Sequence, residues 1–340
     1  MAVRTGGLLI LVMSLLFIGG CGERTLHAQP ASADVWDVHM AMPNRSAQYS
    51  DVGGNDASRF FNRSRPLILP SSIEARFVSE KKTRTPSEGS GRTKKGIIEV
   101  NGERRYYRLY LPNGHDKERS GEIPLVINLH GFSYGAAKHQ AFCRMDRVAD
   151  AKGFGVLYPQ ARRPDLLWGL DSDHAYIEAL IDMVLGRHRF DTERIYATGF
   201  SAGGSMVHYM GSTMSDTLAG IATVSGNAPL NNPIWPRLPE PDFPLPVMMT
   251  FNTRDVFFRG TEDTLDLWKE WNGCTENRTW RKLNDDVLIE GYENCANGTR
   301  VLLYTYAKED PDHGTHFWPW SRHGLEPARE MWRFFSNQTG

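Results

Sequence analysis

The sequence predicts an α/β fold in which a mostly parallel, twisted sheet is covered by helices on both faces. Short apolar runs, typical of strands that are buried on both sides, alternate along the chain with stretches whose apolar residues recur at helical spacing. Such strand–helix alternation is typical of parallel sheets, because a crossover helix returns the chain to the end of the sheet where the next strand begins. The pattern begins at Gly96 and continues to residue 335.

The first element of this body is predicted to be a β-hairpin. Residues 97–100 and 106–111 are rich in apolar and aromatic side chains, and Asn101-Gly102 between them favours a tight type I′ turn. Because a hairpin joins antiparallel strands, we expect it at one edge of the sheet.

The remaining strands and helices follow in alternation. Six further apolar runs are predicted strands, at residues 124–129, 154–158, 194–199, 218–224, 247–251 and 301–306. Five segments are predicted helices, at residues 143–151, 175–185, 203–214, 261–271 and 325–335.

Charge and composition exclude several classes of protein. The chain of 340 residues has 39 Lys and Arg against 40 Asp and Glu, so it lacks the basic surplus that nucleic-acid binding needs. Its 23% charged and 40% hydrophobic residues are typical of a globular protein. Four cysteines are too few for a small fold held together by disulfides.

The N-terminus is predicted to be an export signal. Residues 8–18 form an apolar run of signal-peptide length, which is too short to span a bilayer comfortably. The run ends in Ile18-Gly19-Gly20-Cys21, which resembles the bacterial lipobox, whose cysteine is lipidated. We therefore expect residues 1–21 to be a signal peptide and the mature protein to be an extracytoplasmic envelope lipoprotein that contacts the membrane only through Cys21. The alternatives are ordinary secretion, with cleavage near Ala28 or Ala33, and a retained membrane anchor.

Residues 22–95 show no sustained period. They contain polar and charged runs rich in Ser, Arg and Lys, so we expect a low-complexity tether or N-terminal extension ahead of the folded body at 96–340.

The sharpest chemical signal is Gly199-Phe200-Ser201-Ala202-Gly203. It fits the pattern Gly-x-Ser-x-Gly between a predicted strand and a predicted helix, which is the context of a nucleophile elbow. A serine on so tight a turn needs neighbours without side chains two residues away, and Gly199 and Gly203 supply them. We expect Ser201 to be a catalytic nucleophile; the alternative is a structural glycine-rich turn.

A nucleophilic serine needs an acid to orient its base, and in folds with this elbow the acid follows the serine along the chain. Asp255 lies in the loop after the predicted strand at 247–251. We therefore predict Asp255 as the acid, with Asp242 and Asp263 as the other choices.

The base is expected in the loop after the predicted strand at 301–306. His313 and His316 both lie there, and position alone does not choose between them. The loop also carries Asp310 and Asp312, but no further ligands stand at recognisable spacing, so we expect no metal.

Two backbone amides are predicted to form an oxyanion hole. One belongs to Ala202, which follows the nucleophile, and the other to Phe132, in the loop after the predicted strand at 124–129. We expect His130 in the same loop to be structural.

Together these residues resemble the α/β-hydrolase branch that contains extracellular poly(3-hydroxybutyrate) depolymerases, feruloyl esterases and acetylxylan esterases. The resemblance covers about residues 96–335. The pieces that carry it are Leu129-His130-Gly131, residues 153–159, residues 194–204, Trp271-Asn272-Gly273-Cys274 and His316-Phe317-Trp318-Pro319.

The resemblance implies an α/β-hydrolase catalytic domain over 96–340 and places the catalytic histidine at His316. It also implies a disulfide between Cys274 and Cys295, which suits an exported protein. Cys143 is then left over and is expected to be a small buried residue.

The chain departs from the family pattern near the expected site. Thr315 stands where a glycine usually precedes the histidine, His313 replaces a nearby glycine, and Phe251-Asn252 replaces His-Gly before the loop of the acid. These changes leave the expected triad intact and alter the rim of the site.

The expected function is that of an exported serine carboxylic-ester hydrolase acting on polyester or on cell-wall and aryl esters of feruloyl or acetyl type. Tyr134, Trp168 and Trp318 are predicted to bind the substrate. We expect a monomer that needs no cofactor and binds no nucleic acid. The alternatives are a peptidase or other amide hydrolase on the same fold and a non-catalytic lipoprotein that binds polysaccharide.

Overall fold

The computed structural model describes residues 73–83, 89–115, 121–162, 167–230, 238–275 and 277–337. The chain divides into two units, Met1–Asn55 and Asp56–Gly340, and every described residue lies in the second. The predicted signal peptide, the lipidation of Cys21 and most of the expected tether therefore lie outside the described residues.

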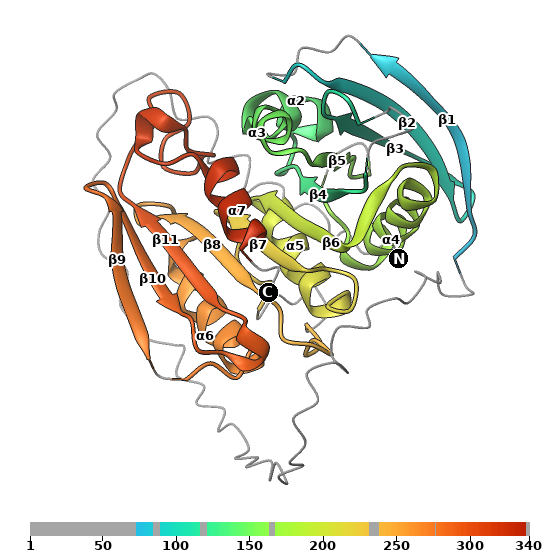
Figure 1. Ribbon diagram of the computed structural model, residues 1–340. Coiled ribbons are helices and arrows are strands. Elements are labelled where there is room, and N and C mark those ends of the chain that lie inside the picture. Colours follow the sequence, from blue (N-terminus) through green and yellow to red (C-terminus); the bar gives the residue numbers. More distant parts are fainter. Residues whose placement is uncertain are drawn as a thin grey trace, which may run out of the picture. The chain divides into compact units, whose positions relative to one another are not determined.

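The centre of the fold is an eleven-stranded sheet with the order β1-β2-β3-β5-β4-β6-β7-β8-β11-β10-β9 (Figure 1). In chain order the strands are β1 (Ala75–Thr83), β2 (Arg92–Val100), β3 (Glu103–Leu111), β4 (Ile123–Leu129), β5 (Gly155–Pro159), β6 (Phe190–Phe200), β7 (Gly220–Val224), β8 (Val247–Asn252), β9 (Arg278–Asn284), β10 (Val287–Tyr292) and β11 (Val301–Tyr306).

The six strands from β5 to β11 in the middle of the sheet are parallel, and the strands at both ends are antiparallel. The central strands are almost wholly buried, as their continuous apolar runs require when helices cover both faces. The carboxyl ends of these parallel strands share one edge of the sheet, and the loops that follow them meet there.

Helices cover the sheet on both sides (Figure 1). One face carries α4 (Leu170–Arg187), α5 (Ala202–Thr213) and α6 (Thr261–Trp271), and the other carries α2 (Gly135–Cys143), α3 (Met145–Lys152) and α7 (Pro327–Ser336). Short 3₁₀ turns lie at Phe258–Gly260, Ala296–Gly298 and Ser321–His323. Each face has its own apolar core, and neighbouring residues of a strand divide between them: Tyr196 of β6 lies in one and Ala197 in the other.

The predicted hairpin is formed by β2 and β3. Its turn residues Asn101 and Gly102 both have positive φ, at 49° and 78°, as a type I′ turn requires. Strand β3 pairs with β5, so the hairpin lies on the β5 side of the parallel strands.

The structure corrects the expected boundary at residue 95. Residues 75–83 form β1, which pairs with β2 along its length, and β2 already begins at Arg92. The sequence does not signal β1, because an edge strand with one exposed face and several charged residues has no continuous apolar run.

The hairpin of β9 and β10 at the opposite edge was also not predicted. Strand β9 is almost entirely exposed, so it lacks the apolar pattern from which the inner strands are predicted. No helix among the described residues is long and apolar enough to cross a membrane.

A disulfide joins Cys274, just after α6, to Cys295, before β11, which confirms the pairing that the resemblance implied. Cys143 is free and buried, as expected, and burial raises the pKa of its thiol to about 12. A thiol with so high a pKa stays protonated and is a poor nucleophile.

Candidate active site

Ser201 lies at the turn between β6 and α5, in a strained backbone conformation with φ 53° and ψ −122°. Its amide donates a hydrogen bond to the carbonyl of Val224, at the end of the neighbouring strand β7, at 2.9 Å. The side chain is therefore presented at the carboxyl edge of the parallel strands, as a nucleophile elbow requires.

The glycines around Ser201 are required because a side chain would not fit at their positions. A Cβ on Gly199 would lie 2.5 Å from the carbonyl group of Gly203, and one on Gly203 would lie 2.5 Å from the carbonyl oxygens of Leu129 and His130. Gly226 is confined in the same way, because its Cβ would lie 2.5 Å from the carbonyl oxygen of Ser201. The first two positions agree with the steric interpretation of the motif; the third lies outside it.

Ser201, His316 and Asp255 form a continuous hydrogen-bonded chain. The Ser201 Oγ lies 2.9 Å from His316 Nε2, and His316 Nδ1 lies 2.7 Å from Asp255 Oδ2. The carboxylate side chain of Asp255 is fully buried, and its other oxygen accepts a hydrogen bond from the Phe257 amide at 3.0 Å. Because a carboxylate only accepts, Nδ1 donates to Asp255, which leaves Nε2 free to accept the Ser201 proton.

The His316 ring is held between two aromatic side chains. Phe200, which is buried, stacks against it with ring centroids 5.1 Å apart. Phe257, which is 40% exposed, contacts the ring edge-on at 5.0 Å. Neither role was predicted, although Phe200 lies inside the elbow motif and Phe257 lies two residues after the acid.

Asn252 ties the loop of the acid to the loop of the histidine. Its buried side-chain amide donates hydrogen bonds to the carbonyls of Lys308 and Thr315, and its Oδ1 accepts from the Arg254 amide. The sequence offered a signal here, because position 252 departs from the family pattern.

The loop after β4 carries Phe132, and it is braced by His130. His130 Nε2 accepts a hydrogen bond from the Ala161 amide at 3.0 Å, and burial lowers the pKa of His130 to about 4, which keeps the ring neutral. Within the described residues, the amides of Phe132 and Ala202 have no hydrogen-bond acceptor. Both donors are thus available, and His130 is structural, as expected.

Two of the three predicted substrate-binding aromatics prove to be buried. Trp168 is 1% exposed, packs at a tilt against the His130 ring and donates its indole N–H to the His130 carbonyl at 2.8 Å. Trp318 is 2% exposed and packs against Phe200 and Phe142. These rings are buried and pack against the loops around the site, so the expectation that they bind the substrate is corrected.

Tyr134 is partly exposed and remains available at the site. Its ring stacks with Phe200, and the Lys138 ammonium lies 4.2 Å from its ring centroid.

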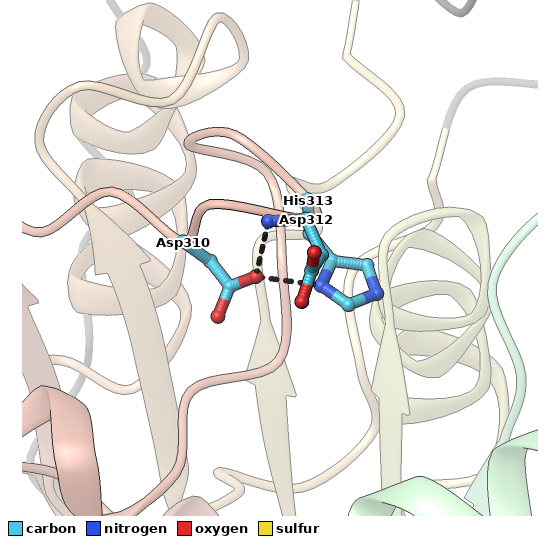
Figure 2. A group of neighbouring side chains, drawn as sticks. All are labelled: Asp310, Asp312 and His313. Carbon is cyan, nitrogen blue, oxygen red and sulfur yellow. Dashed lines mark hydrogen bonds and ion pairs between the residues drawn. The ribbon is translucent and has the colours of Figure 1, made fainter.

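The second histidine of the loop, His313, belongs to a separate cluster with Asp310 and Asp312 (Figure 2). Ligand-type atoms of these three residues lie within 4.8 Å of one another. Asp310 is already fully partnered, however: one carboxylate oxygen accepts from His313 Nδ1 and the Asp312 amide, and the other faces Arg322 and His323. The cluster therefore stabilises the loop that carries His316.

Comparison with known proteins places the chain in a family. The model of a family described as Esterase PHB depolymerase matches residues 105–228. The putative esterase NocK of Nocardia uniformis subsp. tsuyamanensis is 30% identical over 289 residues, which cover 72% of this chain and 79% of that protein. The chain belongs to the esterase family of PHB depolymerases. It is a carboxylic ester hydrolase, as the sequence predicted.

More distant relatives carry more specific names. Feruloyl esterase B of Piromyces equi is 24% identical over 220 residues, which cover 57% of this chain and 40% of that protein. Among solved structures, an acetyl xylan esterase from Aspergillus awamori superposes with a TM-score of 0.53 at 12% identity, over 76% of this chain and 99% of the other. This likeness confirms the α/β-hydrolase fold of the esterase.

Proposed function

We propose that this esterase hydrolyses carboxylic esters through a Ser201–His316–Asp255 triad and an acyl-enzyme. The observation that carries the proposal is the unbroken chain from Ser201 Oγ through both ring nitrogens of His316 to the buried Asp255 carboxylate. The strained elbow and the free amides of Phe132 and Ala202 support it.

In the first half-reaction, Ser201 Oγ attacks the ester carbonyl carbon while its proton moves to His316 Nε2. The carbonyl oxygen becomes an oxyanion that accepts hydrogen bonds from the amides of Phe132 and Ala202. Asp255 stabilises the imidazolium. The carbon–oxygen bond to the alcohol then breaks, and the alcohol takes the proton from Nε2.

In the second half-reaction, a water molecule attacks the acyl-enzyme and gives its proton to His316. The bond to Ser201 Oγ breaks, the serine recovers the proton, and the carboxylic acid leaves. Every proton transfer uses the same ring nitrogen, while Nδ1 stays bonded to Asp255.

The substrate class we propose is a polyester or a cell-wall or aryl ester of feruloyl or acetyl type. The exposed apolar side chains Val256 and Phe257 support it, because both follow the acid directly and can offer an apolar rim to an acyl or aryl group. Phe257 also contacts the His316 ring. Export is proposed from the signal-like segment at residues 1–21 and agrees with the disulfide, which is typical of proteins outside the cytosol.

The test is hydrolysis of p-nitrophenyl acetate, p-nitrophenyl butyrate and methyl ferulate by the full chain and by Ser201→Ala. We expect turnover by the wild type and a loss of about 10⁶-fold in the variant. Ser205→Ala, one helical turn further on, is the matched control and should leave the rate unchanged. Equal rates for wild type and Ser201→Ala in folded, oxidised protein would refute the triad.

A further inference from the structure

A concave site outside the triad lies on the face of the sheet that carries α2. It is a groove of about 840 Å³ above β1, β2 and β3. Its walls include Ala136 and Ala137 in the first turn of α2, and Gln160 at the end of β5. None of the described lining residues is acidic, whereas four are cationic.

Three of the cations form a row across three neighbouring strands. Lys81 of β1 is paired with Lys95 of β2, and Lys95 is paired with Arg108 of β3. Directly opposed like charges destabilise a sheet. Neither lysine has an ion-pair partner among the described residues, so this cost is not relieved within the part of the chain that the structure describes.

The acidic residues of the same strands are engaged elsewhere. Glu80 pairs with Lys94, and Glu99 pairs with Arg76. Glu80 alternates with Lys81 along β1 and so projects to the opposite face. Glu99 lies on the same face as Lys95, four residues further along β2, but it is paired with Arg76 and does not line the groove. The groove therefore keeps its positive charge.

Arg108 supplies an independent sign of a ligand. The residue is 5% exposed and lines the groove. Its Nε donates to Gln140 Oε1 at 2.5 Å, but its Nη2 is buried and has no hydrogen-bond partner. Burial lowers the pKa of Arg108, and the nearby Asp146 carboxylate opposes that shift only in part. A buried N–H group without an acceptor is costly, and an anion in the groove would supply the acceptor.

The groove adjoins the loop that carries the proposed oxyanion donor. Gln160 Oε1 accepts a hydrogen bond from the Ala136 amide at 2.9 Å, and Gln160 Nε2 lies 3.4 Å from Nε2 of His130. Tyr106, which also lines the groove, is 50% exposed and presents an aromatic face. The groove therefore lies beside that loop, on the side to which we assign the rest of a chain molecule whose ester lies at Ser201.

We propose that this groove is a subsite for a carboxylate-bearing sugar unit of the substrate, so that the enzyme removes ester groups from an acidic polysaccharide. This inference rests on the proposed function for the cleavage step. The Lys81–Lys95–Arg108 row binds the carboxylate, and Tyr106 packs against the sugar ring. A concave, aromatic-lined site next to the oxyanion loop suits a single extended chain better than a flat membrane surface.

The test measures binding to the full chain carrying Ser201→Ala by titration calorimetry. The probes are an oligogalacturonate of about six units and a neutral xylo-oligosaccharide of the same length. We expect the acidic probe to bind at least about 10-fold more tightly, with an affinity that falls as salt is raised. Lys81→Gln with Lys95→Gln, two exposed positions, should remove most of this preference, and Arg108→Gln should weaken binding as well.

Lys282→Gln is the matched control, because this exposed lysine lies in the edge strand at the other end of the sheet, and it should leave binding unchanged. Circular dichroism and thermal unfolding show whether each variant is folded. Equal affinity for the two probes, or no effect of the double lysine variant, would overturn the subsite. So would binding only to vesicles that contain phosphatidylglycerol, which would assign the lysines to a membrane surface.

The wild-type rate on p-nitrophenyl acetate separates the two proposals. If the wild type shows no hydrolysis while the Ser201→Ala protein still binds the acidic probe, the proposed triad is refuted and the proposed binding groove is retained. If the rate is present while no preference for the acidic probe is seen, the esterase mechanism stands and the groove fails.

Discussion

Ser201 illustrates how strain and space act on a single residue. A non-glycine residue at positive φ costs free energy of the order of 1–3 kcal/mol, so the surrounding structure has to enforce it. The Ser201 amide is tied to β7, and the glycines at 199, 203 and 226 allow backbones to approach within distances that no side chain would permit. The strain places Oγ within hydrogen-bond distance of His316.

Asp255→Asn should lower kcat about 10⁴-fold with little loss of stability. Asparagine can donate to Nδ1 and so favours the tautomer whose Nε2 carries the proton and cannot accept one from Ser201. Rates on p-nitrophenyl butyrate measure the effect. Asp312→Asn, in an exposed loop position, is the control, and a comparable loss there would speak against a special role for Asp255.

Gly203→Ala should destabilise the protein by about 1–3 kcal/mol, because its Cβ would enter the space of two carbonyl oxygens. Gly186→Ala is the contrast: this glycine lies in α4 with no heavy atom within 4 Å of the added Cβ, so about 0.5 kcal/mol of stabilisation is expected. Urea unfolding of both variants measures these changes in the free energy of unfolding. Similar effects of the two substitutions would contradict the steric account.

Ser201 and Asp255 could be proposed from their context, an elbow and a loop directly after a buried strand, whereas His316 was chosen over His313 only through the family resemblance. Trp168 and Trp318 could not be assigned correctly, because a sequence shows that an aromatic residue lies in a loop but not which way its ring turns. Phe257 was missed for the same reason, and it is the ring that faces outward beside His316.

At the scale of elements, the loop from β11 to α7 is fixed from two sides. Asn252, at the end of β8, donates hydrogen bonds to backbone carbonyls of this loop. Asp310 binds side chains from both ends of the loop. Burial alone would raise the pKa of Asp310, but hydrogen bonds from His313 and Arg322 outweigh it and hold the pKa well below its usual range.

Asp310→Asn should therefore reduce stability at pH 7 by about 1–3 kcal/mol, because it removes the buried, charged acceptor of hydrogen bonds from His313, Arg322 and the Asp312 amide. A depressed carboxyl pKa stabilises the fold above the unfolded pKa of about 3.9, and this contribution is lost as pH falls through the folded pKa. The difference between wild type and variant should stay constant from pH 8 to 5 and shrink in more acidic solution. Urea midpoints across this range measure it, and a pH-independent difference would refute the linkage.

The central elements were predictable from sequence and the edges were not. Strands β4, β6, β7 and β8 are buried on both faces and so carry apolar runs, whereas β1 and β9 expose polar side chains and owe their conformation to their neighbours. Helix α2 was missed because it is short and barely amphipathic.

At the scale of the whole molecule, the disulfide joins the end of α6 to the segment before β11. Cys274 and Cys295 are 21 residues apart, and closing a loop of that size in the unfolded chain stabilises a protein by about 3 kcal/mol. Replacing both cysteines by serine should lower the free energy of unfolding by that amount. Dithiothreitol should lower the urea midpoint of the wild type and leave that of the double variant unchanged; the same response in both proteins would exclude the disulfide as the cause.

The measurement that tests the central claim most directly is peptide mass mapping of the full chain after reaction with a fluorophosphonate. Such a reagent reacts covalently with a serine that a neighbouring histidine activates. The account predicts one adduct per chain, on the peptide that contains Ser201, and its loss in His316→Ala. An adduct on another residue, or none in a folded protein, would contradict it.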